Sequence, residues 1–283
     1  MARRLGIHIV VNPQKRGVQA GAAELRRLLA AHRNIRVAGM STARNADLSR
    51  LPADMVLALG GDGTVLSVCR RMAERQLPVL GIKFGHKGFL AEVLPDEMAE
   101  ACARLAAGRY EVSPRQRIEA VVLRKGRRVA DYVALNDVVV HSGPVARVIF
   151  VGVRVDGELV ASYDADGVIA STPTGSTAYS LAAGGPIVAP DLDAAVITPI
   201  CAHTLAARSM VVSGASTVEV RAESRDRDAA MTVDGQELVR IRNGDVIRLR
   251  RSKHPFMLVE LGNRARYQAI RENLHWAPGT KGR

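Results

Sequence analysis

The chain has 283 residues and a mass of 30.4 kDa, a length typical of two domains and ample for a hydrophobic core. Its hydrophobic fraction of 47% and charged fraction of 24% are those of a globular protein, which excludes a disordered chain, a collagen-like fibre and a disulfide-stapled miniprotein. The net charge is +12, but the basic residues are spread along the chain and only 4% of residues are aromatic. We therefore interpret the charge as a solvated surface that attracts anionic small molecules rather than a nucleic-acid surface.

The cysteines and the apolar runs indicate the cell compartment. Cys69, Cys102 and Cys201 are odd in number and form no CxxC pair. This favours three buried apolar residues in a reducing cytoplasm over a disulfide framework or a zinc site. No apolar run approaches the roughly 18 residues of a membrane span, and Ile7–Val11 is too short for the core of a signal peptide. We expect a cytoplasmic protein with no membrane partner.

Along the first part of the chain, apolar segments of strand type alternate with segments of helical spacing. The run Met55–Leu59 is continuously apolar and ends in two glycines, as in a buried parallel strand. Strands that alternate with helices predict an open parallel sheet covered on both faces. The expected elements are strand Leu5–Val11, helix Ala20–Ala31, strand Ile35–Ala38, strand Met55–Leu59, helix Val65–Glu74, strand Pro78–Ile82 and helix Pro95–Ala107.

The pattern changes near Pro114, after which short β-branched segments are separated by turn pairs. This pattern predicts an antiparallel sandwich or barrel. The clearest turns are Lys125-Gly126, Asp156-Gly157, Asp234-Gly235 and Asn243-Gly244. The expected strands are Ile118–Leu123, Val138–Val140, Val148–Val155, Val218–Ala222, Met231–Val233 and Val246–Leu249.

The tail returns to a helical pattern from Arg264 to His275. We therefore expect an α/β domain over residues 1–113 and an all-β, sandwich-like domain over residues 114–263. The pattern does not show where the tail, residues 264–283, packs.

The first motif with chemical content is Gly60–Thr64 (GGDGT), placed where an apolar strand ends and a helix begins. Ligands bind at this edge of an open α/β sheet, and glycines let the backbone approach them closely. The helix start offers N–H groups to phosphate, with Thr64 expected as the N-cap. Asp62 adds a carboxylate that can orient a hydroxyl, accept its proton or help to hold a divalent metal. Alternatively, the motif is a glycine-rich turn whose aspartate only caps the helix.

A second motif spans Asp166–Ser180 (DGVIASTPTGSTAYS) and continues to Pro186. An apolar strand runs into a hydroxyl-rich turn and then into a segment of small residues. The hydroxyls and Gly175 suit close polar contact with a ligand. By itself the segment fits a capped strand-to-helix turn equally well.

Together with four further segments, these two motifs resemble the NAD kinase family, the ATP-dependent kinases of the nicotinamide dinucleotide. The segments follow the family's order and span most of the chain. The resemblance implies an α/β domain followed by a β-rich domain, with the C-terminal segment 264–283 returning to the first domain. The matching segments are Gly60–Thr64, Gly81–Leu90 (GIKFGHKGFL), Leu135–Asp137, Asp166–Val188, Thr198–Cys201 with His203, and Asp234–Gln236.

The resemblance also implies roles for individual residues. Asp62 matches the family's catalytic aspartate, and Asn136-Asp137 matches the pair that holds NAD, where many relatives carry Glu instead of Asp137. Asp164 departs from relatives that carry a basic residue there. Without the resemblance, Asn136-Asp137 reads as a hydrogen-bonded turn and Arg147 as an exposed strand residue. The implied NAD contacts are Asp62, Gly63, Asn136, Asp137, Arg147, Asp164, Asp166, Thr177, Ala178, Tyr179, Ser180, Leu181, Ala182 and Gln236, and the implied phosphate loop for ATP is Gly60, Gly61 and Thr64.

The reaction implied is transfer of the γ-phosphoryl of ATP to the 2′-hydroxyl of the adenosine ribose of NAD, which gives NADP. Such a transfer depends on in-line positioning and on neutralisation of charge. We expect Asp62 to take the proton and a divalent cation, Mg²⁺, to shield the triphosphate. The seven histidines show no ligand spacing, so the residues that hold the metal are not predicted. The expected partners are the small molecules NAD and ATP, with no nucleic acid, in a homo-oligomer (a dimer or a tetramer) whose sites lie at subunit contacts.

Two other functions fit parts of the sequence. Another GGDGT kinase, acting on a lipid or a sugar phosphate, explains Gly60–Thr64 but not Asp166–Pro186. A dinucleotide-sensing or nucleic-acid-binding protein fits the basic surface. Salt-dependent binding to DNA, without ATP consumption in the presence of NAD, would distinguish it. The sequence does not decide between ATP and polyphosphate as donor.

Overall fold

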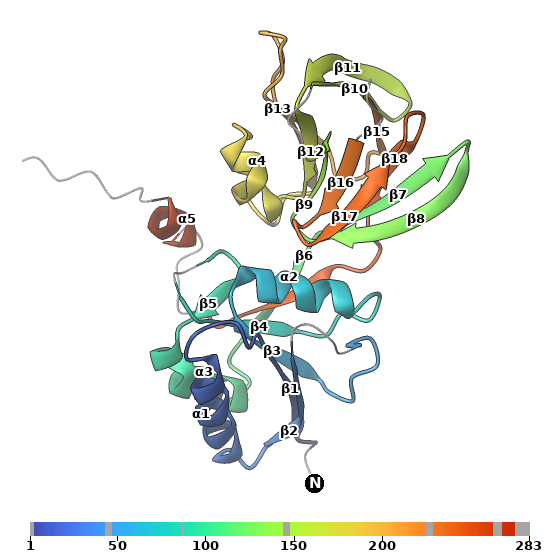
Figure 1. The fold of residues 1–283 in the computed structure, drawn as a ribbon. Coiled ribbons are helices and arrows are strands. Elements are labelled where there is room, and N and C mark those ends of the chain that lie inside the picture. Colours follow the sequence, from blue (N-terminus) through green and yellow to red (C-terminus); the bar gives the residue numbers. More distant parts are fainter. Residues whose placement is uncertain are drawn as a thin grey trace, which may run out of the picture. The chain divides into compact units, whose positions relative to one another are not determined.

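The computed structural model of the chain describes residues 3–42, 47–85, 88–143, 148–224, 229–262 and 268–274. It divides into two compact units, one made of Met1–Pro114 with Phe256–Arg283 and the other of Arg115–Pro255 (Figure 1). The chain returns to the first unit at Phe256, earlier than the residue 264 expected from the sequence. The reason is that strand β19 (Phe256–Glu260) pairs in parallel with β4 (Val79–Lys83) of the first sheet.

The first unit is built on a seven-stranded sheet of order β2-β1-β3-β4-β19-β6, with β5 paired beside β4. The pairs β1–β2, β1–β3, β3–β4 and β4–β5 are parallel, which confirms the predicted open parallel sheet. The remaining strands of this sheet are β1 (Leu5–Val11), β2 (Ile35–Thr42), β3 (Met55–Gly60), β5 (Ala91–Val93) and β6 (Glu111–Arg115).

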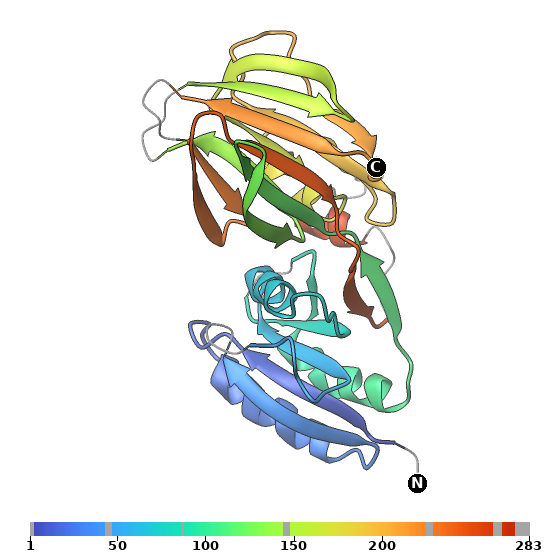
Figure 2. The same cartoon turned by 90° about the vertical axis from the view of Figure 1, so that its right-hand side faces the viewer.

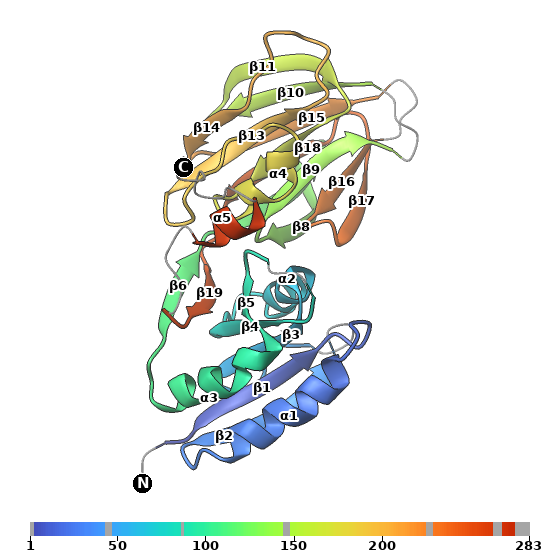
Figure 3. The same ribbon diagram turned by 90° about the vertical axis from the view of Figure 1, so that its left-hand side faces the viewer.

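Helices cover the sheet of the first unit. Helices α1 (Val18–Ala30) and α3 (Met98–Ala106) lie side by side and share a core with Ile7, Ile9 and Val11 of β1 (Figures 1 and 3). Side chains alternate along a strand, so the buried intervening residues of β1 point to the other face. Helix α2 (Asp62–Arg71) packs against β3 and β4. A short 3₁₀ turn, η1 (Pro95–Glu97), leads into α3, and the described part of the tail contains helix α5 (Gln268–Asn273), within the span predicted to be helical.

The second unit consists of two six-stranded antiparallel sheets with a common core, seen in Figure 2, which confirms the predicted sandwich. One sheet has the order β11-β10-β15-β18-β7-β8 and the other β14-β13-β12-β9-β16-β17. The strands of the first are β7 (Ile118–Arg124), β8 (Arg127–Ala134), β10 (Ile149–Val155), β11 (Glu158–Ala165), β15 (Val218–Glu223) and β18 (Val246–Arg251). The strands of the second are β9 (Asp137–Ser142), β12 (Gly167–Ser171), β13 (Ala194–Ile200), β14 (Met210–Ser213), β16 (Ala229–Val233) and β17 (Glu237–Ile241).

Three of the predicted turns have the backbone conformation that a tight hairpin requires. Lys125, Asp156 and Asp234 all have φ near +50°, and the glycine that follows each of them also has positive φ. Two successive residues with positive φ are the mark of the tight turn that matches strand twist, which explains the Asp-Gly and Lys-Gly pairs.

The cysteines differ from expectation in one case. Cys69 and Cys102 are buried, and burial raises the pKa of the Cys102 thiol to about 11. Cys201 is exposed, contrary to the prediction, because it lies in a bend just after the end of β13 with φ of +47°. Within the described residues, no helix combines the length and the apolar character that crossing a membrane demands.

Candidate active site

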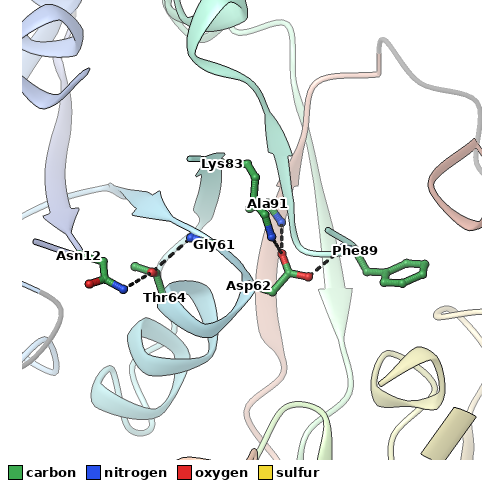
Figure 4. Close-up of polar contacts among 7 residues, drawn as sticks. All are labelled: Asn12, Gly61, Asp62, Thr64, Lys83, Phe89 and Ala91. Atoms are coloured by element: carbon green, nitrogen blue, oxygen red, sulfur yellow. Dashed lines mark hydrogen bonds and ion pairs between the residues drawn. The ribbon is translucent and has the colours of Figure 1, made fainter. Parts of the chain in front are cut away.

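Helix α2 begins inside the Gly60–Thr64 loop, at the carboxyl end of β3. Asp62 is its first residue and Gly61 its N-cap, so the prediction that Thr64 is the N-cap is wrong. The carbonyl of Gly61 accepts the N–H groups of Thr64 and Val65 at 2.8 and 3.2 Å, which starts the helix three residues before the predicted Val65. The hydroxyl of Thr64 is buried, accepting the N–H of Gly61 at 3.3 Å and the amide of Asn12 at 3.4 Å, so it braces the loop from inside (Figure 4).

The carboxylate of Asp62 is held by the segment that leads into β5. The N–H of Phe89 donates to Oδ2 at 2.9 Å, and the N–H of Ala91 donates to Oδ1 at 3.1 Å (Figure 4). Gly88 permits this approach, because a Cβ there would lie 2.2 Å from Oδ1 and 2.3 Å from Oδ2. The ammonium of Lys83, on β4, stands 3.5 Å from Oδ1. The loop therefore presents a fixed carboxylate, with a neighbouring cation, at the amino end of a helix.

Sequence reasoning assigned no role to Lys83, Gly88, Phe89 or Ala91. The match to GIKFGHKGFL pointed to this segment as family-like, but the residue types alone do not show a contact with Asp62. The contact follows from strand order, because β4 lies between β3 and β5 and brings the carboxyl ends of β3 and β4 to one edge.

The described residues do not form a protein cage for a metal ion. No group of three or more His, Cys, Asp or Glu side chains gathers in this part of the chain. The one carboxylate at the glycine loop already accepts two N–H groups. A divalent cation that came with ATP would therefore depend mainly on phosphate oxygens and water for its ligands, as Mg²⁺ commonly does.

In the second unit, the carboxylate of Asp234 organises the segment that leads into β9. It accepts the N–H groups of Leu135, Asn136 and Asp137 at 2.9, 2.7 and 3.1 Å. The N–H of Asp234 in turn donates to the carbonyl of Asp137 at 2.9 Å. Asp234 was predicted as a turn residue within a family-like segment, without a role of its own, and its contacts with residues nearly a hundred positions away depend on the pairing of β16 with β9.

Asp137 is a buried carboxyl group, 5% exposed. Burial, and secondarily the charge of Asp234, raises its pKa to about 7. Such a group changes its protonation near neutral pH and is suited to hydrogen bonding with ligand hydroxyls.

The second motif is fixed beside Asn136. The hydroxyl of Thr172 donates to the carbonyl of Leu135 at 2.6 Å and accepts the N–H of Gly175 at 3.0 Å. A Cβ on Gly175 would lie 2.0 Å from the carbonyl oxygen of Asn136, so this approach requires glycine. The 3₁₀ turn η2 (Gly175–Thr177) and helix α4 (Tyr179–Ala182) follow directly.

The predicted contact residues of this motif differ in how far they are exposed to solvent. Ser180 is buried and shares a hydrogen bond of 2.8 Å with Thr198. Tyr179 and Ala182 are exposed, while Thr177, Ala178 and Leu181 are half-buried. Gln236 is exposed in the turn after Asp234.

Not all predicted site residues come together within the second unit. Ser171 pairs with Asp137 across β12 and β9, whereas Gly167 pairs with His141. Asp166 directly precedes Gly167 and so lies at the opposite end of β12 from Asp137, roughly 16 Å along the strand at about 3.3 Å per residue. Asp164 lies near the end of β11, which belongs to the other sheet. Arg147 lies outside the described residues, and Asp62 and Gly63 belong to the first unit.

Comparisons with known proteins agree with this arrangement of motifs. The family model "ATP-NAD kinase N-terminal domain" matches residues 42–110, and "ATP-NAD kinase C-terminal domain" matches residues 135–261. The chain is 43% identical over 235 residues to the NAD kinase of Geotalea daltonii, which covers 83% of this chain and 82% of that protein. It is 36% identical over 280 residues to the NAD kinase of Thiobacillus denitrificans, which covers 95% of this chain and 96% of that one.

Two solved structures are also similar. An NAD kinase from Archaeoglobus fulgidus in complex with ATP superposes with a TM-score of 0.77 at 27% identity, covering 97% of this chain and all of that one. Yeast NADH kinase complexed with NADH has a TM-score of 0.87 at 22% identity, covering 99% of this chain and 90% of that one. At 22% identity, the similarity to yeast NADH kinase shows a shared fold.

Proposed function

The chain belongs to the NAD kinase family and converts NAD to NADP, and we propose how its residues divide this work. ATP donates its γ-phosphoryl to the 2′-hydroxyl of the adenosine ribose of NAD. The ribose oxygen forms a bond to the γ-phosphorus, the bond from that phosphorus to the β,γ-bridging oxygen breaks, and ADP leaves. Asp62 takes the proton of the hydroxyl.

The observation that carries this assignment is the setting of the Asp62 carboxylate. Two backbone N–H groups fix its direction at the first residue of α2. The amino end of a helix attracts phosphate, so a base placed there stands beside the group to be transferred. We assign Gly60 and Gly61 to the ATP phosphates, with Thr64 supporting the loop. Mg²⁺ travels with the triphosphate and neutralises its charge.

The dinucleotide contacts remain a proposal carried over from the family. The close approach of the Leu135-Asn136 backbone to the turn at Thr172–Gly175, which leads directly into Thr177–Ala182, supports it. Gly63, Arg147 and Gln236 complete the proposed set, together with Asp164 and Asp166.

A homo-oligomer, a dimer or a tetramer, is part of this proposal. Asp166 lies at the far end of β12 from Asp137, and Asp164 lies on β11 of the other sheet, so neither is adjacent to Asp137 within one copy. We propose that a second copy supplies Asp164 and Asp166. Mixing inactive Asn136→Ala and Asp164→Ala proteins restores activity in this case, because some sites then draw both intact residues from different copies. If mass spectrometry shows that the subunits have exchanged but activity does not recover, the sites are not shared between copies.

We also place the enzyme in the cytoplasm. All three cysteines are free, which fits a reducing compartment.

The test of the proposed function is NADP formation measured with an NADP-specific dehydrogenase as the coupling enzyme. ATP and polyphosphate are compared as donors, and NAD and 2′-deoxy-NAD as acceptors. We expect NADP from NAD and ATP, and no phosphorylated product from the 2′-deoxy analogue, although it binds. Product from that analogue would move the reaction to another hydroxyl, and product from polyphosphate alone would displace ATP as the donor.

A further inference from the structure

Lys83 brings a positive charge to the glycine loop from the neighbouring strand. It is the last residue of β4 and pairs with Gly60, the last residue of β3. Its side chain is 15% exposed, and its ammonium stands 3.5 Å from Oδ1 of Asp62 (Figure 4). A Cβ built on Gly61 would lie 3.4 Å from that ammonium, so the charge sits directly on the surface of the loop.

The ammonium has hydrogen-bonding capacity beyond its contact with Asp62. A lysine ammonium carries three N–H donors, and a distance of 3.5 Å exceeds that of a normal N–H···O bond. The Asp62 carboxylate is already oriented by the N–H groups of Phe89 and Ala91. Lys83 is therefore not required to fix Asp62, and its donors face the amino end of α2, where phosphate binds best.

We propose that Lys83 binds the phosphoryl group transferred from ATP, an inference that rests on the proposed function. The base and the γ-phosphate are both anionic and must approach each other closely. An ammonium beside both of them offsets their repulsion and neutralises charge on the phosphoryl oxygens as the bond to ADP breaks. Because the side chain is 15% exposed, solvent screens this charge less than it screens the charge of a surface lysine.

The first test separates contact with phosphate from pairing with Asp62. ATP affinity is measured by calorimetry in Asp62→Asn and in Asp62→Asn/Lys83→Met, with Asp62→Asn/Lys253→Met as the matched control, since Lys253 is an exposed lysine. Removing Lys83 is expected to weaken ATP binding about tenfold even though no carboxylate is left to pair with it. Removing Lys253 is expected to leave binding within twofold. Equal ATP affinity in all three proteins overturns the proposal.

The second test uses turnover. Lys83→Met is expected to lower kcat about 10²-fold, the usual loss when one stabilising donor is removed, with the KM for NAD within threefold. Lys83→Gln is the second variant, in case the methionine protein does not fold. A kcat within threefold of wild type in either folded variant overturns the proposal while leaving the NAD kinase function intact. Absence of NADP formation by the wild type would instead contradict the function itself.

A chemical rescue distinguishes the charge from the shape of the side chain. Lys83→Cys treated with 2-bromoethylamine regains an ammonium at nearly the length of lysine, whereas iodoacetamide adds a neutral group. Treated wild type controls for modification of the exposed Cys201. We expect the first reagent to restore at least a tenth of the lost activity and the second to restore none. Equal outcomes with the two reagents contradict a role for the charge.

Discussion

Replacing Gly88 with alanine is expected to misplace the Asp62 carboxylate while the fold persists. The new Cβ would lie 2.2 and 2.3 Å from the two carboxylate oxygens, whereas ordinary contact begins at 3.4 Å. These oxygens are the far end of a flexible side chain, so the carboxylate retreats by about 1 Å, an offset that typically costs about 10²-fold in rate. The N–H groups of Phe89 and Ala91 then lose their acceptor, at a cost of about 1–3 kcal/mol in the free energy of unfolding.

The assay for Gly88→Ala is steady-state NADP formation together with urea unfolding. Gly152→Ala is the matched control, because a Cβ at Gly152 meets nothing within 4 Å. We expect kcat to fall about 10²-fold in Gly88→Ala and to stay within twofold in Gly152→Ala. A Gly88→Ala protein with wild-type kcat would refute the reasoning, since it would show that the position of the Asp62 carboxylate does not limit the reaction.

Two further predictions concern the second unit. Because the pKa of Asp137 is raised to about 7, from about 3.9 in an unfolded chain, the folded protein retains a proton that the unfolded chain has lost between about pH 4 and 7. Stability therefore falls as pH rises through this window, by up to about 1.4 kcal/mol per pH unit, and levels off above it. Asp137→Asn is expected to remove that decline, which urea unfolding at a series of pH values measures. If the free energies of unfolding of the two proteins change with pH in parallel, the Asp137 carboxyl is not buried in its protonated form. Gly175→Ala is expected to lower the free energy of unfolding by about 3 kcal/mol, because its Cβ would meet the backbone carbonyl of Asn136 at 2.0 Å; an unchanged unfolding midpoint counts against that close approach.

The sequence predicts the layers of this protein better than the ends of its elements. Met55–Gly60 is a continuous apolar run, and such runs in alternation with helices specify a parallel sheet. Helix α2 begins earlier than predicted because the Gly61 carbonyl accepts the first helical N–H groups, in a loop that the Thr64 hydroxyl braces by bonding Gly61 and, 52 residues away, Asn12. Local spacing carries no information about the second of these contacts.

Edge strands account for several elements that the sequence did not predict. Strands β8, β11, β14 and β17 are the outer strands of the two sheets in the second unit. Each has one neighbour and exposes many of its residues, so the alternation of apolar and polar positions is weak there. Inner strands such as β12, buried along its whole length, carry a clear signal.

A residue of the candidate site could be predicted from the sequence where its neighbours along the chain reveal its role, but not where its role depends on contacts with distant segments. Asp62 stands out because a carboxylate among glycines at the end of a buried strand is typical of a loop that binds a ligand. Lys83, Gly88 and Asp234 do not stand out, since their roles depend on which strands become neighbours. Asp234 meets Leu135 across 99 positions of the chain, and only the paired sheet shows that its carboxylate holds the Asn136-Asp137 segment.

The most direct test of the proposed mechanism is the rate of the chemical step in Asp62→Asn, measured in a single turnover with enzyme in excess over NAD at saturating ATP. Asparagine keeps the size of the side chain but cannot take the proton of the 2′-hydroxyl. We predict that phosphoryl transfer slows by about 10² to 10⁴-fold, while the Kd for NAD stays close to that of the wild type. The free energy of unfolding is expected to fall by about 1–3 kcal/mol, because asparagine offers a single acceptor oxygen to the N–H groups of Phe89 and Ala91. A transfer rate equal to that of the wild type would contradict the assignment of Asp62 as the base.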